Sequence, residues 1–146
     1  MNTKAILLVE DNPQDEMLTL RALRQANLAN RIDVVRDGQQ ALDYLFQEGD
    51  FANREGPSLP AVVLLDLGLP RLSGLEVLAR IRADARTHLL PVVILTSSDD
   101  ERDRLQGYET GCNSFVLKPV DFAAFAETVA SLGIFWLAIN EPPFSK

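Results

Sequence analysis

The sequence is poor in residue types that define several protein classes. Its 146 residues include one cysteine, Cys112, so no disulfide can form within the chain. They also include a single histidine, His88, which falls between an expected helix and an expected strand. A phosphotransfer histidine would be expected on an exposed helix of a bundle, so we interpret His88 as an ordinary loop residue.

Positive charge and long apolar runs are also scarce. The chain has 14 Lys and Arg against 21 Asp and Glu, a formal net charge of −7 at pH 7. This balance argues against binding to nucleic acid or to anionic membranes. We see no apolar run that approaches the roughly 20 residues of a membrane span. The N-terminus lacks a signal-peptide pattern. With so little cysteine, we expect a cytoplasmic protein with no nucleic-acid or membrane partner.

Short apolar runs alternate with amphipathic segments through the whole chain. We expect one domain over residues 1–146, with an ordered core at about 4–138, a tail at 139–146 and no output domain. Strand-like runs cover residues 4–9, 32–35, 61–65, 92–95 and 114–117. Helical patterns cover residues 13–27, 99–110 and 121–138, together with the segments around Ala41–Phe46 and Leu75–Ile81.

This alternation predicts an α/β fold in which helices cover both faces of a parallel sheet. Right-handed crossovers leave few topologies for five strands. We therefore expect a flavodoxin-like, doubly wound, five-stranded sheet with strand order 2-1-3-4-5 and five helices. The polar connection at residues 48–60 exceeds the usual length, so it is either functional or loosely ordered.

Polar side chains stand at the ends of four predicted strands. Glu10 and Asp11 follow the first, Asp66 the third, Thr96 the fourth and Lys118 the fifth. In the order 2-1-3-4-5 these four strands are consecutive neighbours, each about 4.8 Å from the next. Crowded carboxylates repel one another, and their hard oxygen atoms suit Mg²⁺. With a lysine and a hydroxyl beside them, they suit phosphoryl transfer with an aspartate as nucleophile.

Four segments carry a resemblance to a known family. They are Leu8-Val9-Glu10-Asp11-Asn12-Pro13, Leu65-Asp66-Leu67-Gly68-Leu69-Pro70, Leu95-Thr96-Ser97-Ser98 and Phe115-Val116-Leu117-Lys118-Pro119. Over nearly the whole chain the sequence resembles the receiver domains of response regulators in two-component signalling. The resemblance implies that a sensor histidine kinase, or a phosphorelay partner, phosphorylates the protein in a Mg²⁺-dependent reaction. Signalling would then pass through protein–protein interaction.

The resemblance also implies a role for each polar strand end. Asp66 is the expected phosphoacceptor, and Thr96 and Lys118 are expected to contact its phosphoryl group. Thr96 and Phe115 form the expected switch pair. The expected Mg²⁺ ligands are Glu10, Asp11, Asp66 and the main-chain carbonyl of Gly68.

Three details of the expected site should be noted. Gly68 stands where many relatives carry a side chain near the attacking water, which affects the hydrolysis rate. Phe115 lacks the hydroxyl of the commoner tyrosine, so its switch must act by packing. The Lys118–Pro119 peptide bond is expected to be cis, a geometry that proline tolerates.

Two further patterns concern partners. The 48–60 connection, the Asp66–Pro70 segment and the Asn113–Phe122 run are similar to stand-alone receivers that serve phytochrome-type kinases. The stretch Ile134–Leu137 is apolar all round its expected helix, more than one buried stripe requires. We therefore expect a homodimer through the face formed by the fourth helix, fifth strand and fifth helix. The alternative is that these side chains cover the chain's own sheet.

Three other functions remain open. A phosphatase with Asp66 as nucleophile usually has a second carboxylate two residues on, where this chain has Gly68. A flavin electron carrier of the same fold needs a first loop that binds phosphate, which Glu10 and Asp11 would repel. A docking module that is never phosphorylated would not need the full set of acids, threonine and lysine. The activity we expect is limited to the protein's own phosphorylation and dephosphorylation.

Overall fold

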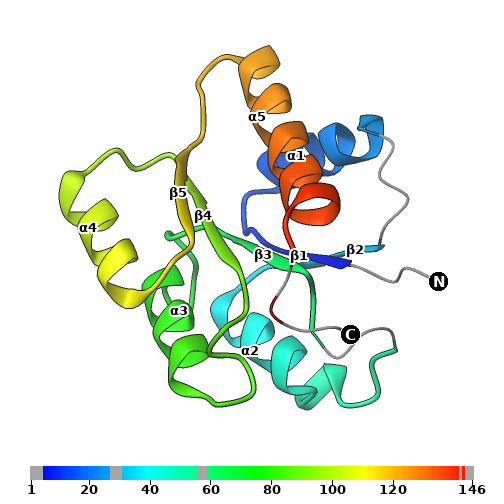
Figure 1. Ribbon diagram of the computed structural model, residues 1–146, viewed down its shortest axis with the longest axis vertical. Coiled ribbons are helices and arrows are strands. Elements are labelled where there is room, and N and C mark those ends of the chain that lie inside the picture. Colours follow the sequence, from blue (N-terminus) through cyan, green and yellow to red (C-terminus); the bar gives the residue numbers. More distant parts are fainter. Residues whose placement is uncertain (1–4, 27–30, 56–58, 142, 144–146) are drawn as a thin grey trace.

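Five parallel strands form one sheet in the order β2-β1-β3-β4-β5 in a computed structural model that describes residues 5–26, 31–55, 59–141 and 143. The strands are β1 (Ala5–Val9), β2 (Arg31–Val35), β3 (Val62–Leu65), β4 (Val92–Thr96) and β5 (Ser114–Leu117). The α-helices are α1 (Pro13–Gln25), α2 (Gly38–Phe46), α3 (Gly74–Ala83), α4 (Glu101–Thr110) and α5 (Phe122–Ile134). Figure 1 shows this alternation, which confirms the predicted flavodoxin-like fold.

Most predicted boundaries agree with the structure to within two residues. The helix predicted at 99–110 begins at Glu101 because the Asp100 side chain caps it, accepting a hydrogen bond from the Arg102 main chain at 2.9 Å. Parts of several predicted segments lie outside the described residues. These are Lys4, Asn27, the 56–58 part of the long connection, and positions 142 and 144–146 of the tail.

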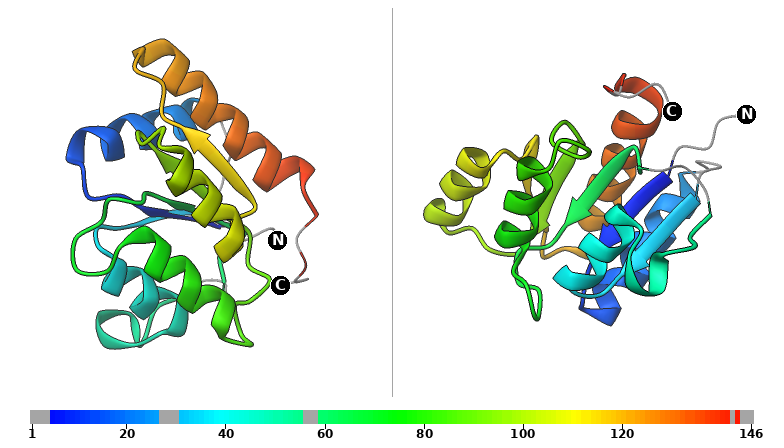
Figure 2. Two further views of the ribbon diagram at one scale, coloured as in Figure 1. Left: turned by 90° about the vertical axis from the view of Figure 1, so that its left-hand side faces the viewer. Right: turned by 90° about the horizontal axis from the view of Figure 1, so that it is seen from below.

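Two apolar layers hold the helices on the sheet. Helices α1 and α5 cover one face, and α2, α3 and α4 lie on the other (Figures 1 and 2). Strands β1, β3 and β4 are fully buried, and their side chains alternate between the two layers. The central strands therefore read as unbroken apolar runs, and polar residues begin only where each strand ends.

The last helix reaches as far as predicted and is strongly apolar. Helix α5 continues into a π-helical turn, η2 (Phe135–Ile139), and Phe122–Ile139 has a mean hydropathy of 1.8 over 18 residues. By length and composition alone this helix could span a membrane, so the expectation that no apolar run approaches that length is wrong. Isoleucine, leucine, valine and phenylalanine residues raise its hydropathy, and Glu127 is its one charged residue. Trp136 is buried in the α1–α5 layer of the core, so the helix has a structural role in the fold.

The long connection is partly ordered around Tyr44. A short 3₁₀ helix, η1 (Gly49–Phe51), directs the Phe51 ring edge-on to the Tyr44 ring, with 5.5 Å between centroids. The Arg54 guanidinium lies 4.0 Å above the centroid of the same ring. These contacts place the described part of the 48–60 segment against α2.

Candidate functional site

The ends of β1, β3, β4 and β5 bring the predicted site residues to one edge of the sheet. Val9 pairs with Leu65 across β1 and β3, so the residues that follow each strand are neighbours. A cleft of about 610 Å³ opens there, and Asp11, Asp66 and Lys118 are among its lining residues. Gly68 and Thr96 line the same cleft.

Three carboxylates in this cleft could share one cation. Oxygen atoms of Glu10, Asp11 and Asp66 lie within 4.8 Å of one another. Their exposure to solvent increases along the series: Glu10 is 2% exposed, the Asp66 side chain is 14% exposed, and Asp11 faces solvent. Hard oxygen donors with access to water fit a divalent cation such as Mg²⁺. The Gly68 carbonyl remains a predicted ligand; the Gly68 amide lies 3.5 Å from Asp66 Oδ1.

Lys118 joins these carboxylates from β5. Its Nζ atom donates to Glu10 Oε1 at 2.8 Å, to Asp15 Oδ2 at 2.8 Å and to Asp66 Oδ2 at 3.3 Å. The side chain is 8% exposed. All three ammonium donors are therefore used within the protein.

Burial and charge move two pKa values at the site. Burial raises the pKa of Glu10 from 4.5 to about 7, with a smaller contribution from the Asp66 charge, while the hydrogen bond from Lys118 opposes the shift. Burial alone would lower the pKa of Lys118. The hydrogen bonds to Asp15 and Glu10 and the charge of Asp66 outweigh that effect, so the pKa of Lys118 is raised. Lys118 thus stays cationic at neutral pH.

Thr96 and Phe115 lie on the same side of the sheet. Phe115 pairs with Ile94, two residues before Thr96, and alternation places all three side chains towards one face. The Thr96 hydroxyl is 3.3 Å from the Ser98 amide, which donates to it. The Phe115 ring packs against α4 at Gly107, where an added Cβ would lie 3.1 Å from the ring.

The peptide bond between Lys118 and Pro119 differs from the expectation. No cis peptide bond occurs among the described residues, so this bond is trans and the expected cis geometry is wrong for this structure. An X–Pro bond favours trans by only about 0.5–1 kcal/mol, so sequence alone sets the isomer weakly.

Local capping fixes the two loops that carry the acids. Asn12 accepts from the Gln14 and Asp15 amides at the start of α1, directly after Glu10 and Asp11. Ser73 and Glu76 form a capping box at the start of α3, on the chain that returns from Asp66. Both helices therefore begin at the cleft.

Two residues important to the site were missed from the sequence. Asp15 bonds Lys118, and its place in the first turn of α1, soon after Glu10 and Asp11, was the available signal. Gly74 lies so close to the main chain of Asp66 and Leu67 that a Cβ would collide with the Asp66 carbonyl. No short-range pattern reveals that approach.

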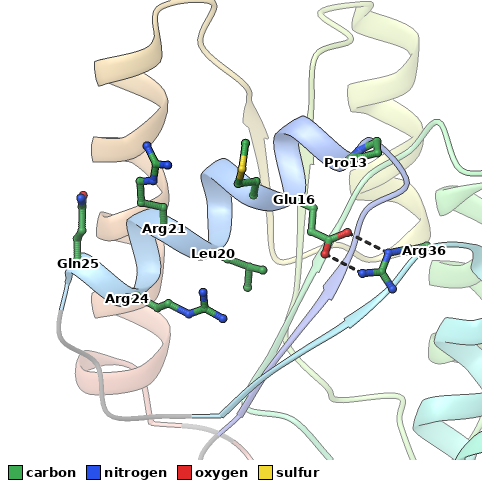
Figure 3. Close-up of a pocket in the computed structure, with 8 residues that line it drawn as sticks. Pro13, Glu16, Leu20, Arg21, Arg24, Gln25 and Arg36 are labelled. Carbon is green, nitrogen blue, oxygen red and sulfur yellow. Dashed lines mark hydrogen bonds and ion pairs between the residues drawn. The ribbon is translucent and has the colours of Figure 1, made fainter.

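A second, larger groove runs along α1 and contains none of the predicted site residues (Figure 3). Leu20 and three arginines, Arg21, Arg24 and Arg36, line it, and Glu16 pairs with Arg36 at 2.8 Å. Its single acidic side chain is thereby neutralised. Most of the predicted site residues line the smaller cleft, which is therefore the candidate site.

Residues 6–130 match the family model described as "Response regulator receiver domain". The chain belongs to this family. The receiver domain is 42% identical over 139 residues to a probable methanogenesis regulatory protein, FilR2, of Methanothrix harundinacea, covering 94% of this chain and 86% of that one. It is 36% identical over 134 residues to the response regulator Rcp1 of Synechocystis, covering 92% and 89%.

Solved structures extend the comparison. The phosphorylated cyanobacterial phytochrome response regulator RcpA superposes with a TM-score of 0.91 at 36% identity, covering 98% of this chain and 100% of that one. The Mn²⁺-bound form of Rcp1 superposes with a TM-score of 0.89 at 34% identity, covering 97% and 99%. This receiver domain is therefore related to phytochrome response regulators along almost its full length.

Proposed function

We propose that this receiver domain accepts a phosphoryl group on Asp66 from a sensor histidine kinase, in a Mg²⁺-dependent reaction, and signals by binding other proteins. The observation that carries the proposal is the position of Asp66. Its carboxylate shares Lys118 with Glu10 and lies within cation-sharing distance of Glu10 and Asp11. The phosphorylated state of RcpA and the Mn²⁺-bound state of Rcp1 support the same reading.

Each group has a chemical task in this proposal. An Asp66 oxygen attacks phosphorus and forms an acyl phosphate, as the bond from phosphorus to the donor breaks. Glu10, Asp11 and Asp66 would hold the Mg²⁺ ion, with the Gly68 carbonyl as a fourth ligand. When bound, that ion neutralises charge on the transferring group. Lys118 provides a second positive charge, and Thr96 provides a hydroxyl donor to the phosphoryl oxygens.

The readout in this proposal passes from Thr96 to Phe115 and α4. Movement of Thr96 towards new phosphoryl acceptors would leave space that the Phe115 ring can fill. The face of α4, β5 and α5 would change shape and recognise a partner or a second copy. Phosphorylation-dependent partner binding that survived Thr96→Ala would refute this coupling.

We infer that the kinase is of the phytochrome type and that the protein acts in the cytoplasm, without nucleic-acid or membrane contact. The likeness to RcpA and Rcp1 supports the kinase class. The name of FilR2 points to a different signal, so the kinase must be tested directly. Phosphotransfer from a purified phytochrome kinase, absent with an unrelated sensor kinase, is the expected outcome.

Intact-mass measurement tests the central claim. Incubation with Mg²⁺ and a small acyl phosphate should add one phosphoryl group to the wild type and none to Asp66→Asn. Asp103→Asn is a matched control because Asp103 lines the same cleft but lies outside the cation-sharing set. It should gain the same mass as wild type. An unchanged wild-type mass, or a gain by Asp66→Asn, would refute phosphorylation at Asp66.

A further inference from the structure

Asp15 holds Lys118 as closely as any other residue does. The Nζ atom lies 2.8 Å from Asp15 Oδ2, the same as its distance to Glu10, and 3.3 Å from Asp66. Three charge-assisted hydrogen bonds therefore share one ammonium group, and the bond to Asp66 is the longest.

Asp15 also stands apart from the cation-sharing carboxylates. The set that could hold a metal ion contains Glu10, Asp11 and Asp66 but not Asp15, among the residues that the structure describes. A dication bound to Glu10 and Asp66 would repel Lys118 from both of them. The Lys118 side chain is 8% exposed and cannot simply turn into water, so it needs a buried or half-buried partner.

We infer that Asp15 is a positioning residue that holds the Lys118 ammonium when a divalent cation takes Glu10 and Asp66, so that cation and lysine occupy the site together. This inference rests on the proposed cation-dependent function. Asp15 favours cation binding in two ways, since its charge attracts the ion and its bond to Lys118 draws the competing ammonium aside. Both effects strengthen cation binding.

The Asp15 carboxylate makes none of the hydrogen bonds that cap α1. The cap of α1 uses the Asn12 side chain and the Asp15 main-chain amide, at 3.1 Å. Thr19 Oγ1 bonds the Asp15 main-chain carbonyl at 2.7 Å. Asp15→Asn leaves all of these bonds in place, so the variant should fold with α1 unchanged.

Calorimetric titration with Mn²⁺ alone, at one fixed pH for all variants, tests the inference without any phosphoryl donor. Asp15→Asn should bind Mn²⁺ about tenfold more weakly than the wild type. Asp15→Glu keeps the charge and should restore most of the affinity. Glu16→Gln is the matched control, since it removes a charge from the next residue of α1 but one that pairs with Arg36 (Figure 3). It should change the affinity about twofold or less.

The outcomes separate the two claims. Wild-type affinity in Asp15→Asn would overturn the role of Asp15 while leaving the proposed function intact. An equal loss in Glu16→Gln would also overturn it, because the effect would then be general charge and not position. No Mn²⁺ binding by the wild type would overturn the proposed cation dependence and, with it, this inference.

Discussion

At the residue scale, Glu10 makes stability depend on pH. Burial raises its pKa from 4.5 to about 7, so the folded protein holds this proton more tightly than the unfolded chain does. Its contribution to stability is complete below about pH 4.5 and is lost as the pH rises through about 7. With a chelator present, the free energy of unfolding should fall between about pH 5 and pH 8, by an amount on the order of 1–3 kcal/mol.

Urea denaturation across this pH range would measure the effect. Glu10→Gln has no carboxyl to ionise and should abolish that fall. If the glutamine variant kept the wild-type slope, another group would be responsible.

Two glycines near Asp66 should differ sharply in how well they tolerate substitution by alanine. A Cβ at Gly74 would collide with the Asp66 carbonyl and lie 2.7 Å from the Leu67 Cα atom, whereas a Cβ at Gly68 meets nothing within 4 Å. We expect Gly74→Ala to lower the free energy of unfolding by about 2 kcal/mol or more, and to slow phosphorylation, because the Asp66 main chain must move. Gly68→Ala should change stability by less than about 1 kcal/mol. Equal melting temperatures for the two variants would contradict this.

The same contrast explains which site residues the sequence could predict. Glu10, Asp66 and Lys118 directly follow apolar strands, so the strand order alone places them together. Gly74 and Asp15 depend on how closely a helix approaches a loop or a lysine, and that distance is set by packing across the whole edge of the sheet.

At the scale of elements, Arg82 ties α3 to its neighbours through oxygen atoms. Its guanidinium donates to the main-chain carbonyls of Gly111 at 2.8 Å, Leu90 at 2.7 Å and His88 at 3.0 Å. It also donates to the Asn113 side chain at 3.0 Å, whose oxygen accepts from the first residue of β4 as well. One side chain thus joins the ends of α3 and α4 to the starts of β4 and β5.

Arg82→Ala should therefore lower the free energy of unfolding by about 2–4 kcal/mol, because four hydrogen bonds, one of them to the carbonyl of the buried Leu90, lose their charged donor. Arg80→Ala is the control, since Arg80 is exposed on the same helix and should change stability by less than about 0.5 kcal/mol. Chemical denaturation of both variants measures the difference. A similar small effect for the two would mean that water replaces the Arg82 bonds.

Element type was predictable and some element ends were not. Capping residues such as Asn12, Asp37 and Asp121 mark helix starts in the sequence and cap them in the structure. The π turn after α5 has no such signal, because a change from i+4 to i+5 hydrogen bonding hardly alters the apolar pattern. The 3₁₀ turn in the long connection likewise follows from contacts with Tyr44, which lies in another element.

At the scale of the whole molecule, the face of α4, β5 and α5 exposes an unusual amount of apolar surface. Exposed large apolar side chains on these elements, and on the loop between β5 and α5, include Leu105, Tyr108, Leu117, Val120, Phe122 and Ile134. Val120 is fully exposed, so a charge there should not affect folding. Several exposed apolar side chains on neighbouring elements favour association.

We expect sedimentation velocity to show a dimer after incubation with a phosphoryl donor, and Val120→Glu to remain a monomer. Leu89→Glu is the control, since Leu89 is exposed and apolar but precedes β4 and lies outside this face. It should dimerise as the wild type does. A wild-type monomer with and without the donor would rule out the homodimer.

Strand order could be predicted from general rules of crossover and alternation, and it agrees with the structure. Dimer formation could not be predicted as reliably from the sequence, because some apolar residues of α5 pack on the sheet and others face outwards. Phe125 and Val129 cover the sheet, while Phe122 and Ile134 face outwards, and the helix is apolar on both sides.

The bond from Lys118 to Glu10 spans 108 positions of the chain. During synthesis Glu10 and Asp11 leave the ribosome long before Lys118, which follows the fifth strand. A nascent chain that stops short of β5 has the carboxylates but not the cation that organises them. The carboxylates and the lysine are therefore brought together only when the sheet is complete, so under the proposed function an unfinished or partly unfolded chain would not accept a phosphoryl group.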